Sequence, residues 1–131
     1  MPDDAEKQLH LLWRHHQQWL RNNLVRDALL LDCYSLPPEM GDVDICIGFN
    51  EDESKPDQSV IELAVNHFED MGYKVRVNYP YSRSETPACD FPYHSLILEI
   101  NKRAYLRSGT IDLIDNRLHD VIRAFMGQLL A

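Results

Sequence analysis

The residue with the clearest chemical potential is Glu99, a carboxylate enclosed in the apolar segment His94-Ser95-Leu96-Ile97-Leu98-Glu99-Ile100. A buried carboxylate must be paired, hydrated in a cleft or shifted in its pKa. Each of these states suits a general base, and an ion pair with Lys102 or Arg103 is the structural alternative. His94 begins the same segment, and strand alternation places it on the opposite face from Glu99. Glu99 is therefore the candidate catalytic residue.

Two aspartates, Asp32 and Asp44, also interrupt apolar runs. Both are weak candidates for metal ligands, and loop bracing or capping is the alternative interpretation. His15 and His16 are adjacent on a predicted helix, so they face different sides and cannot act as an i, i+4 metal-binding pair. The sequence contains no HExxH motif, no GxSxG motif and no glycine-rich phosphate loop. The residues by themselves therefore assign no metal site.

Composition limits the classes of protein to which the chain can belong. Its 131 residues suit one domain over residues 1–131. The net charge of −8 disfavours nucleic acid as a partner but leaves room for a local basic pocket that binds a small anion. No apolar run approaches the roughly 20 residues that span a bilayer, and the start lacks the pattern of a signal peptide. Three cysteines without CxxC spacing fit a reducing cytoplasm.

Hydrophobic periodicity predicts the elements that position these residues. Helices are expected over residues 4–26, from 56–57 to 72 and from 108–110 onward, and strands over 28–33, 43–48, 73–78 and 94–100. The long segment 79–92 is expected to be a loop. Cys33 and Cys46 are expected in the core, and Cys89 in the exposed part of that loop.

This order predicts an α/β fold with a mostly parallel sheet of about four strands flanked by helices. Ligands of such sheets gather at the carboxyl ends of the strands. The polar residues at those ends are Asp32, Tyr34, Ser35, Asn78 and Glu99.

Several segments together resemble the N-formylglutamate amidohydrolase family. Residues 29–35, Leu-Leu-Leu-Asp-Cys-Tyr-Ser, are similar to a family strand that ends in Asp-Cys-His-Ser. Residues 41–48, the stretch 72–105 and Trp-Arg-His-His at 13–16 are also similar, in the same order. The likeness covers nearly the whole chain and corresponds to the C-terminal half to two-thirds of the family domain.

The resemblance implies a fold related to the zinc carboxypeptidases. It also implies hydrolysis of the amide in a small anionic N-acyl amino-dicarboxylic acid, with zinc as the metal. Glu99 would then be the general base that activates water. The candidates for holding substrate carboxylates or the developing oxyanion are Arg76, Asn78, His94 and Lys102.

Three departures from the family pattern keep alternatives open. Tyr34 stands where the family has a metal-binding histidine, Arg83-Ser84 replaces a Gly-Gly pair, and the upstream His-Ser-Gly motif is not in this chain. One alternative is an amidohydrolase with a remodelled site or one completed by another chain. The other is a non-catalytic module that binds a small anion or a partner. An open sheet edge would make a homo-oligomer plausible on either interpretation.

Overall fold

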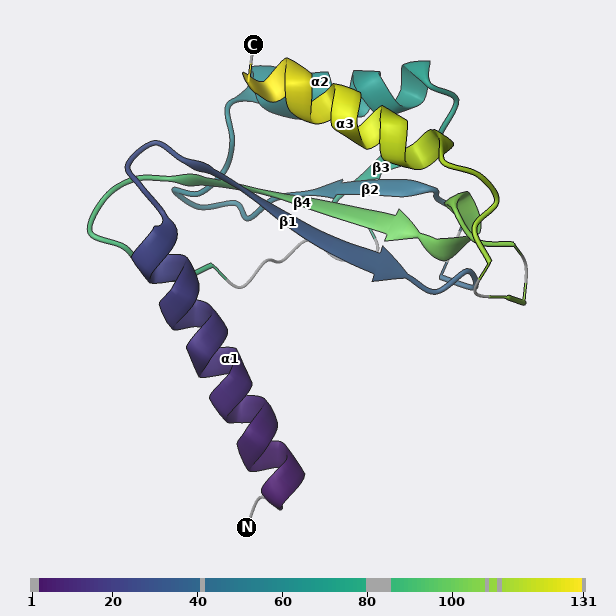
Figure 1. Ribbon diagram of the computed structural model, residues 1–131. Helices are drawn as coiled ribbons and strands as arrows, with labels where there is room; N and C mark the ends of the chain where they lie inside the picture. Colours follow the sequence, from purple (N-terminus) through teal and green to yellow (C-terminus); the bar gives the residue numbers. More distant parts are fainter. Residues whose placement is uncertain (1–2, 41, 80–85, 108, 111, 131) are drawn as a thin grey trace.

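The computed structural model describes residues 3–40, 42–79, 86–107, 109–110 and 112–130. The order of helices and strands is the predicted one (Figure 1). The elements are α1 Asp4–Asn23, β1 Leu29–Leu36, β2 Ile45–Gly48, α2 Gln58–Asp70, β3 Val75–Val77, β4 His94–Asn101, the 3-10 helix η1 Lys102–Ala104 and α3 Arg117–Leu130.

The described strands form a four-stranded sheet in the order β1-β4-β2-β3. β1 is parallel to β4 and β2 is parallel to β3, but the central pair β4–β2 is antiparallel. The prediction of a mostly parallel sheet is therefore wrong, and the sheet is mixed. Only residues 37–44 join β1 to β2. A parallel connection needs a crossover of a dozen or more residues, so β2 runs back against the direction of β1 and β4.

Helices α2 and α3 lie side by side on one face of the sheet and bury the core against it (Figure 1). The rings of Phe68 and Phe125 pack with their centroids 5.2 Å apart. The ring nitrogen Nε2 of His67 hydrogen-bonds the backbone oxygen of Val121 at 2.8 Å, which ties the two helices together. The buried residues of this core are Ile45, Ile47, Ala64, Phe68, Leu96, Leu98, Leu118, Val121 and Phe125.

The helix ends follow local backbone chemistry. Helix α2 ends before Gly72, whose φ of 91° is left-handed, so the predicted glycine cap is confirmed. Helix α3 begins at Arg117 rather than at 108–110, because Leu106 and Leu113 form a β-bridge and the Asp115 side chain accepts a hydrogen bond from the Arg117 N–H at 2.9 Å. Residues 108 and 111 lie outside the described part of the chain.

Helix α1 extends away from the sheet and its two covering helices (Figure 1). Leu20 is its one buried residue among those described, and the apolar side chains nearer its start are exposed. Of the cysteines, Cys46 is buried as predicted, whereas Cys33 is exposed and Cys89 is half-buried. No helix within the described residues is long and apolar enough to cross a membrane.

Candidate active site

A row of four side chains crosses the sheet on the face opposite α2 and α3. The strand register pairs Glu99 of β4 with Tyr34 of β1 on one side and with Cys46 of β2 on the other. Cys46 is paired in turn with Arg76 of β3. Paired positions in a sheet project to the same face, so these residues form a continuous line, called here the Glu99 row.

The carboxyl group of Glu99 is enclosed, and no counter-charge for it lies in the described part of the chain. The residue is 5% exposed, and no described side chain donates a hydrogen bond to it or forms an ion pair with it. Burial raises the pKa of this carboxyl above its ordinary value, and the negative charge of Asp32 raises it further. The alternative of an ion pair with Arg103 is wrong, because Arg103 pairs with Asp42 and Asp44.

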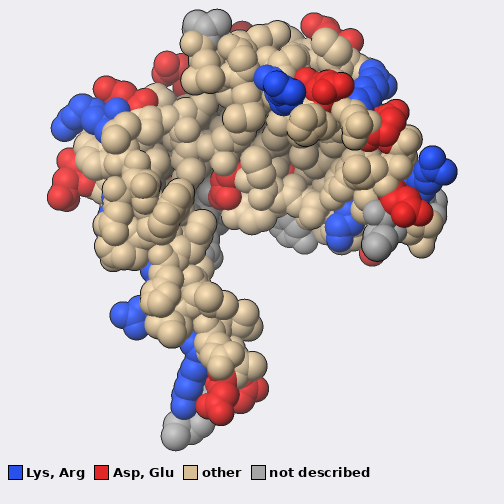
Figure 2. Space-filling view, viewed as in Figure 1, with Lys and Arg blue, Asp and Glu red and all other residues tan. Residues whose placement is uncertain are grey.

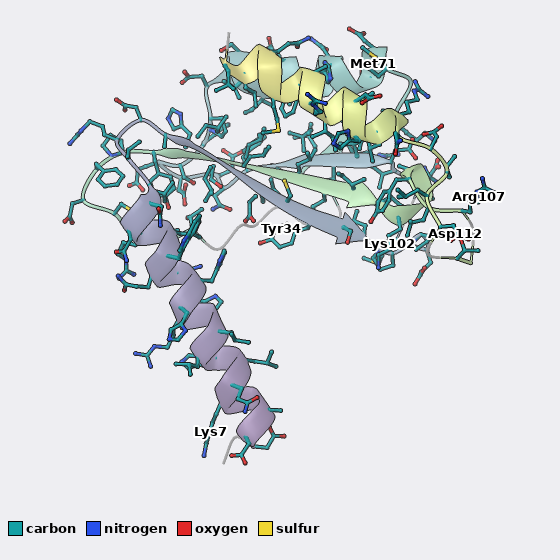
Figure 3. The ribbon with its side chains drawn as sticks, viewed as in Figure 1. Lys7, Tyr34, Met71, Lys102, Arg107 and Asp112 are labelled. Atoms are coloured by element: carbon teal, nitrogen blue, oxygen red, sulfur yellow. The ribbon has the colours of Figure 1, made fainter. Side chains whose placement is uncertain are left out.

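Tyr34 is the neighbour of Glu99 on β1. Figure 3 shows it on the side of the sheet away from α2 and α3. Its hydroxyl donates a hydrogen bond to Oδ2 of Asp32 at 3.0 Å. Asp32 lies two positions earlier on β1 and therefore on the same face. This places a phenol and a second carboxylate beside Glu99.

The other half of the row ends in a cation. Cys46 is fully buried, and its Sγ accepts a hydrogen bond from the Tyr79 N–H at 3.3 Å. Burial raises the pKa of the Cys46 thiol, so it stays protonated at neutral pH and is a poor nucleophile. Beyond it, the Arg76 guanidinium lies over the Tyr79 ring, 5.4 Å from its centroid, and the residue is exposed.

Three other residues predicted for the site lie apart from the Glu99 row. Asn78 has a left-handed φ of 53°, and its side-chain oxygen accepts the Phe49 N–H at 3.0 Å, so it braces the turn after β3. His94 starts β4 on the helix-covered face, about 17 Å along the strand from Glu99. Lys102 lies in η1 and lines a separate pocket together with Leu106, Arg107 and Ile114.

The described residues do not form a zinc cage. A catalytic zinc takes three protein ligands, and no group of three His, Cys, Asp or Glu residues in the described ranges could hold a metal. Asp44 is occupied elsewhere, since it accepts hydrogen bonds from the Lys74 N–H and from Nε of Arg103. Asp32 and Glu99 share one face of the sheet with Tyr34, whose neutral phenol is a poor zinc ligand. These donors do not fit the metal that the resemblance implies.

Two buried polar groups near the row are not among the predicted site residues. Oγ of Ser95 and Nδ2 of Asn101 have no hydrogen-bond partner within the described residues. Both residues lie on β4 and share the face of Glu99 by alternation. The signal was available in the sequence, because each is a polar residue in an otherwise apolar strand. Unpaired donors inside a protein are costly, and a bound water and a functional role are two of the explanations for them.

A cleft of about 1140 Å³ opens between α1 and the loops that follow β2 and β3. Figure 2 shows this hollow between the projecting helix and the rest of the molecule. Arg14 and Arg21 line it from α1, and residues 49–52 line the opposite wall. Gly48, at the end of β2, pairs with Ile97, two positions before Glu99. Phe49, the residue after Gly48, lines the cleft, whereas none of the four residues of the Glu99 row is among its described lining residues.

The enclosed carboxyl of Glu99, with its raised pKa, is a candidate acid–base group on a helix-covered α/β sheet. Residues 2–106 match the sequence model of the N-formylglutamate amidohydrolase family, so the chain belongs to that family.

A solved structure supports the same fold. The crystal structure of N-formylglutamate amidohydrolase from Ralstonia eutropha JMP134 is similar, with a TM-score of 0.57 and 19% sequence identity. The likeness covers 76% of this chain and 41% of that chain, so this chain spans less than half of its neighbour. No curated protein sequence matches.

Proposed function

We propose that this chain is an amidohydrolase that cleaves the linear amide of a small anionic N-acyl amino acid, with Glu99 as the general base. The observation that carries the proposal is the enclosed Glu99 carboxyl, which has a raised pKa and no described counter-charge. Membership of the family supports an amide as the bond that is broken. No specific observation favours the alternative of a non-catalytic module.

In the proposed reaction, Glu99 accepts a proton from a water molecule as the water oxygen bonds to the amide carbonyl carbon. The protonated Glu99 then gives this proton to the amine nitrogen as the C–N bond breaks. The products are a carboxylic acid and a free amino acid. A raised pKa suits this double role, because the carboxyl must both take up and release the proton near neutral pH.

The ends of the Glu99 row would orient the substrate. Arg76 is two strands away from Glu99, about 10 Å across the sheet, and its long side chain can reach back toward it. A guanidinium holds a carboxylate with two parallel hydrogen bonds, so Arg76 would bind the acidic group of the substrate. Tyr34, on the other side, carries the hydroxyl closest to Glu99 in the strand register.

The experiment compares N-formyl-L-glutamate, N-acetyl-L-glutamate and N-formyl-L-leucine as substrates of the full chain, with release of the free amine as the readout. We expect turnover of the acidic substrates at a lower KM than the leucine compound. Arg76→Gln should remove that preference by raising KM for the acidic substrates about tenfold or more. Arg123→Gln, an exposed change on α3, is the matched control. Release of no amine from any substrate, with or without added zinc, would contradict the proposal.

A further inference from the structure

A second pocket, of about 710 Å³, lies at the carboxyl ends of β1 and β4. Pro38 lines it two residues after the end of β1, and Lys102, the first residue after β4, lines it as well. Because β1 and β4 are parallel, their carboxyl ends lie at the same end of the sheet. Ligands of α/β sheets gather outside such strand ends, and pockets of roughly 300–1,000 Å³ hold small molecules. The position and the volume of the pocket therefore suit a small ligand.

The pocket carries an excess of positive charge. Lys102, Arg103 and Arg107 line it, and no carboxylate is among its described lining residues. Arg103 is held by ion pairs with Asp42 and Asp44. Lys102 and Arg107, which Figure 3 labels at the same end of the molecule, form no ion pair within the described residues. On a chain of net charge −8, these two cations provide a local attraction for an anion.

Apolar side chains share the pocket with these cations. Leu106 is half-buried, whereas Ile114 is 45% exposed although it is a large apolar residue. A bare inorganic anion would leave this apolar surface in water, whereas a carboxylate with an apolar chain or ring would cover it. Small-molecule sites combine apolar walls with a few charged or polar groups in this way. The lining therefore favours an organic anion over free phosphate.

Backbone hydrogen bonds fix the positions of these lining residues. The Leu106 N–H donates to the backbone oxygen of Lys102 at 2.8 Å. The Arg107 N–H donates to the backbone oxygen of Asp112 at 2.9 Å, and Leu106 also forms the β-bridge with Leu113. The backbone that carries the cations and the apolar side chains is thus ordered before a ligand arrives, which lowers the entropic cost of binding.

We propose that this pocket binds a small carboxylate that carries an apolar chain or ring. Lys102 and Arg107 contact the carboxylate, and Leu106 and Ile114 pack against the apolar part. None of the four residues of the Glu99 row is among the described residues that line the pocket. The site is therefore separate from the proposed active site, and the proposal does not depend on amidohydrolase activity.

Titration of the full chain with octanoate, followed by NMR of the backbone amides, tests the charged part of the site. We expect saturable binding with the largest shifts at Leu106 and Arg107. Lys102→Gln and Arg107→Gln should each raise the dissociation constant about fivefold or more, because each removes a charge-assisted contact. Lys7→Gln is the matched control and should leave binding unchanged, because Lys7 is an exposed lysine near the start of the projecting helix α1 (Figure 3).

A second pair of variants tests the apolar part. Ile114 and Leu113 are neighbours that are 45% and 56% exposed, but only Ile114 is among the described residues that line the pocket. Ile114→Asn should weaken octanoate binding, and Leu113→Asn should not. Acetate and inorganic phosphate should bind at least about tenfold more weakly than octanoate, because they lack the apolar chain.

Three results would overturn the proposal: no saturation by about 10 mM octanoate, phosphate binding as tight as octanoate binding, or equal weakening by the pocket variants and their controls. Amide signals that stay unchanged outside the pocket would show that each variant remains folded, so that a loss of binding reports on the site itself.

Discussion

At the scale of the residue, the raised pKa of Glu99 comes first from burial and then from the negative charge of Asp32, with no described cation to offset them. Arg103, four positions away, is held by Asp42 and Asp44, and Asp42 also pairs with Lys74. This network of surface ion pairs holds Arg103 to the two aspartates. Asp32, the charged group that acts on Glu99, has the same sign. The carboxyl is consequently easier to protonate than a carboxyl in water.

This raised pKa has a consequence for stability. A carboxyl whose pKa is higher in the folded state binds protons more tightly there than in the unfolded chain. Folding stability is then lost as pH rises from the unfolded value of about 4.3 through the raised folded pKa. Glu99→Gln removes this loss, so we expect the variant to melt above the wild type at pH 8, with the difference shrinking toward pH 4. Calorimetry at the two pH values provides the measurement, and a difference independent of pH would contradict it.

At the scale of the element, the strand and helix positions could be predicted from periodicity, but strand directions could not be read from it. The apolar run of β4 identifies a buried central strand, whereas the similar run of β1 forms an edge strand in which Leu36 alone is buried. The segment between Leu36 and Ile45 indicates the antiparallel direction of β2, because it is too short for a crossover connection. The start of α3 was misplaced because Ser108-Gly109-Thr110 looks like a helix start, whereas the chain first forms the Leu106–Leu113 bridge.

The strand pairings that form the Glu99 row could not be predicted from the sequence. Glu99 itself is visible as a carboxylate in an apolar strand. Its pairing with Tyr34 depends on the register between β1 and β4, which are far apart in the chain, and its pairing with Cys46 depends on the antiparallel direction of β2. His94 was placed on the correct face, opposite Glu99, by alternation alone.

Two glycines give a matched prediction about helix structure. Gly72 caps α2 with a φ of 91°, and an added Cβ would meet only Nη2 of Arg117, at 3.6 Å. Gly72→Ala should therefore destabilise the fold by about 1 kcal/mol through backbone strain. Gly127 lies inside α3, and an added Cβ would meet no described atom within 4 Å. Gly127→Ala should stabilise the fold by about 0.8 kcal/mol. Urea unfolding measures both; shifts of the same sign would contradict this account.

At the scale of the whole molecule, the sheet separates the hydrophobic core from the proposed active site. Its α2–α3 face holds the core cluster, and the opposite face holds the Glu99 row. The family match begins at residue 2 and so includes α1, although α1 extends beyond the packed part of the molecule. The chain corresponds to 41% of its solved neighbour.

This separation predicts that core and site can be changed independently. Phe125→Ala removes a fully buried ring that packs on Phe68 and His67. We expect a loss of about 3–5 kcal/mol of unfolding free energy. Under conditions where the variant remains folded, its activity per folded molecule should match the wild type. Urea unfolding followed by an assay at low temperature measures both quantities, and a large loss of activity in the folded variant would contradict the separation.

Glu99 is proposed to perform the proton transfers of amide hydrolysis. The most direct test of this proposal is the kcat for N-formyl-L-glutamate in the wild type, in Glu99→Gln and in Glu62→Gln, a change on the exposed side of α2. We expect Glu99→Gln to lower kcat by about 10²–10⁴-fold while it remains folded, and Glu62→Gln to leave kcat unchanged. Wild-type turnover that survives in Glu99→Gln at more than about a tenth of its value would contradict the claim.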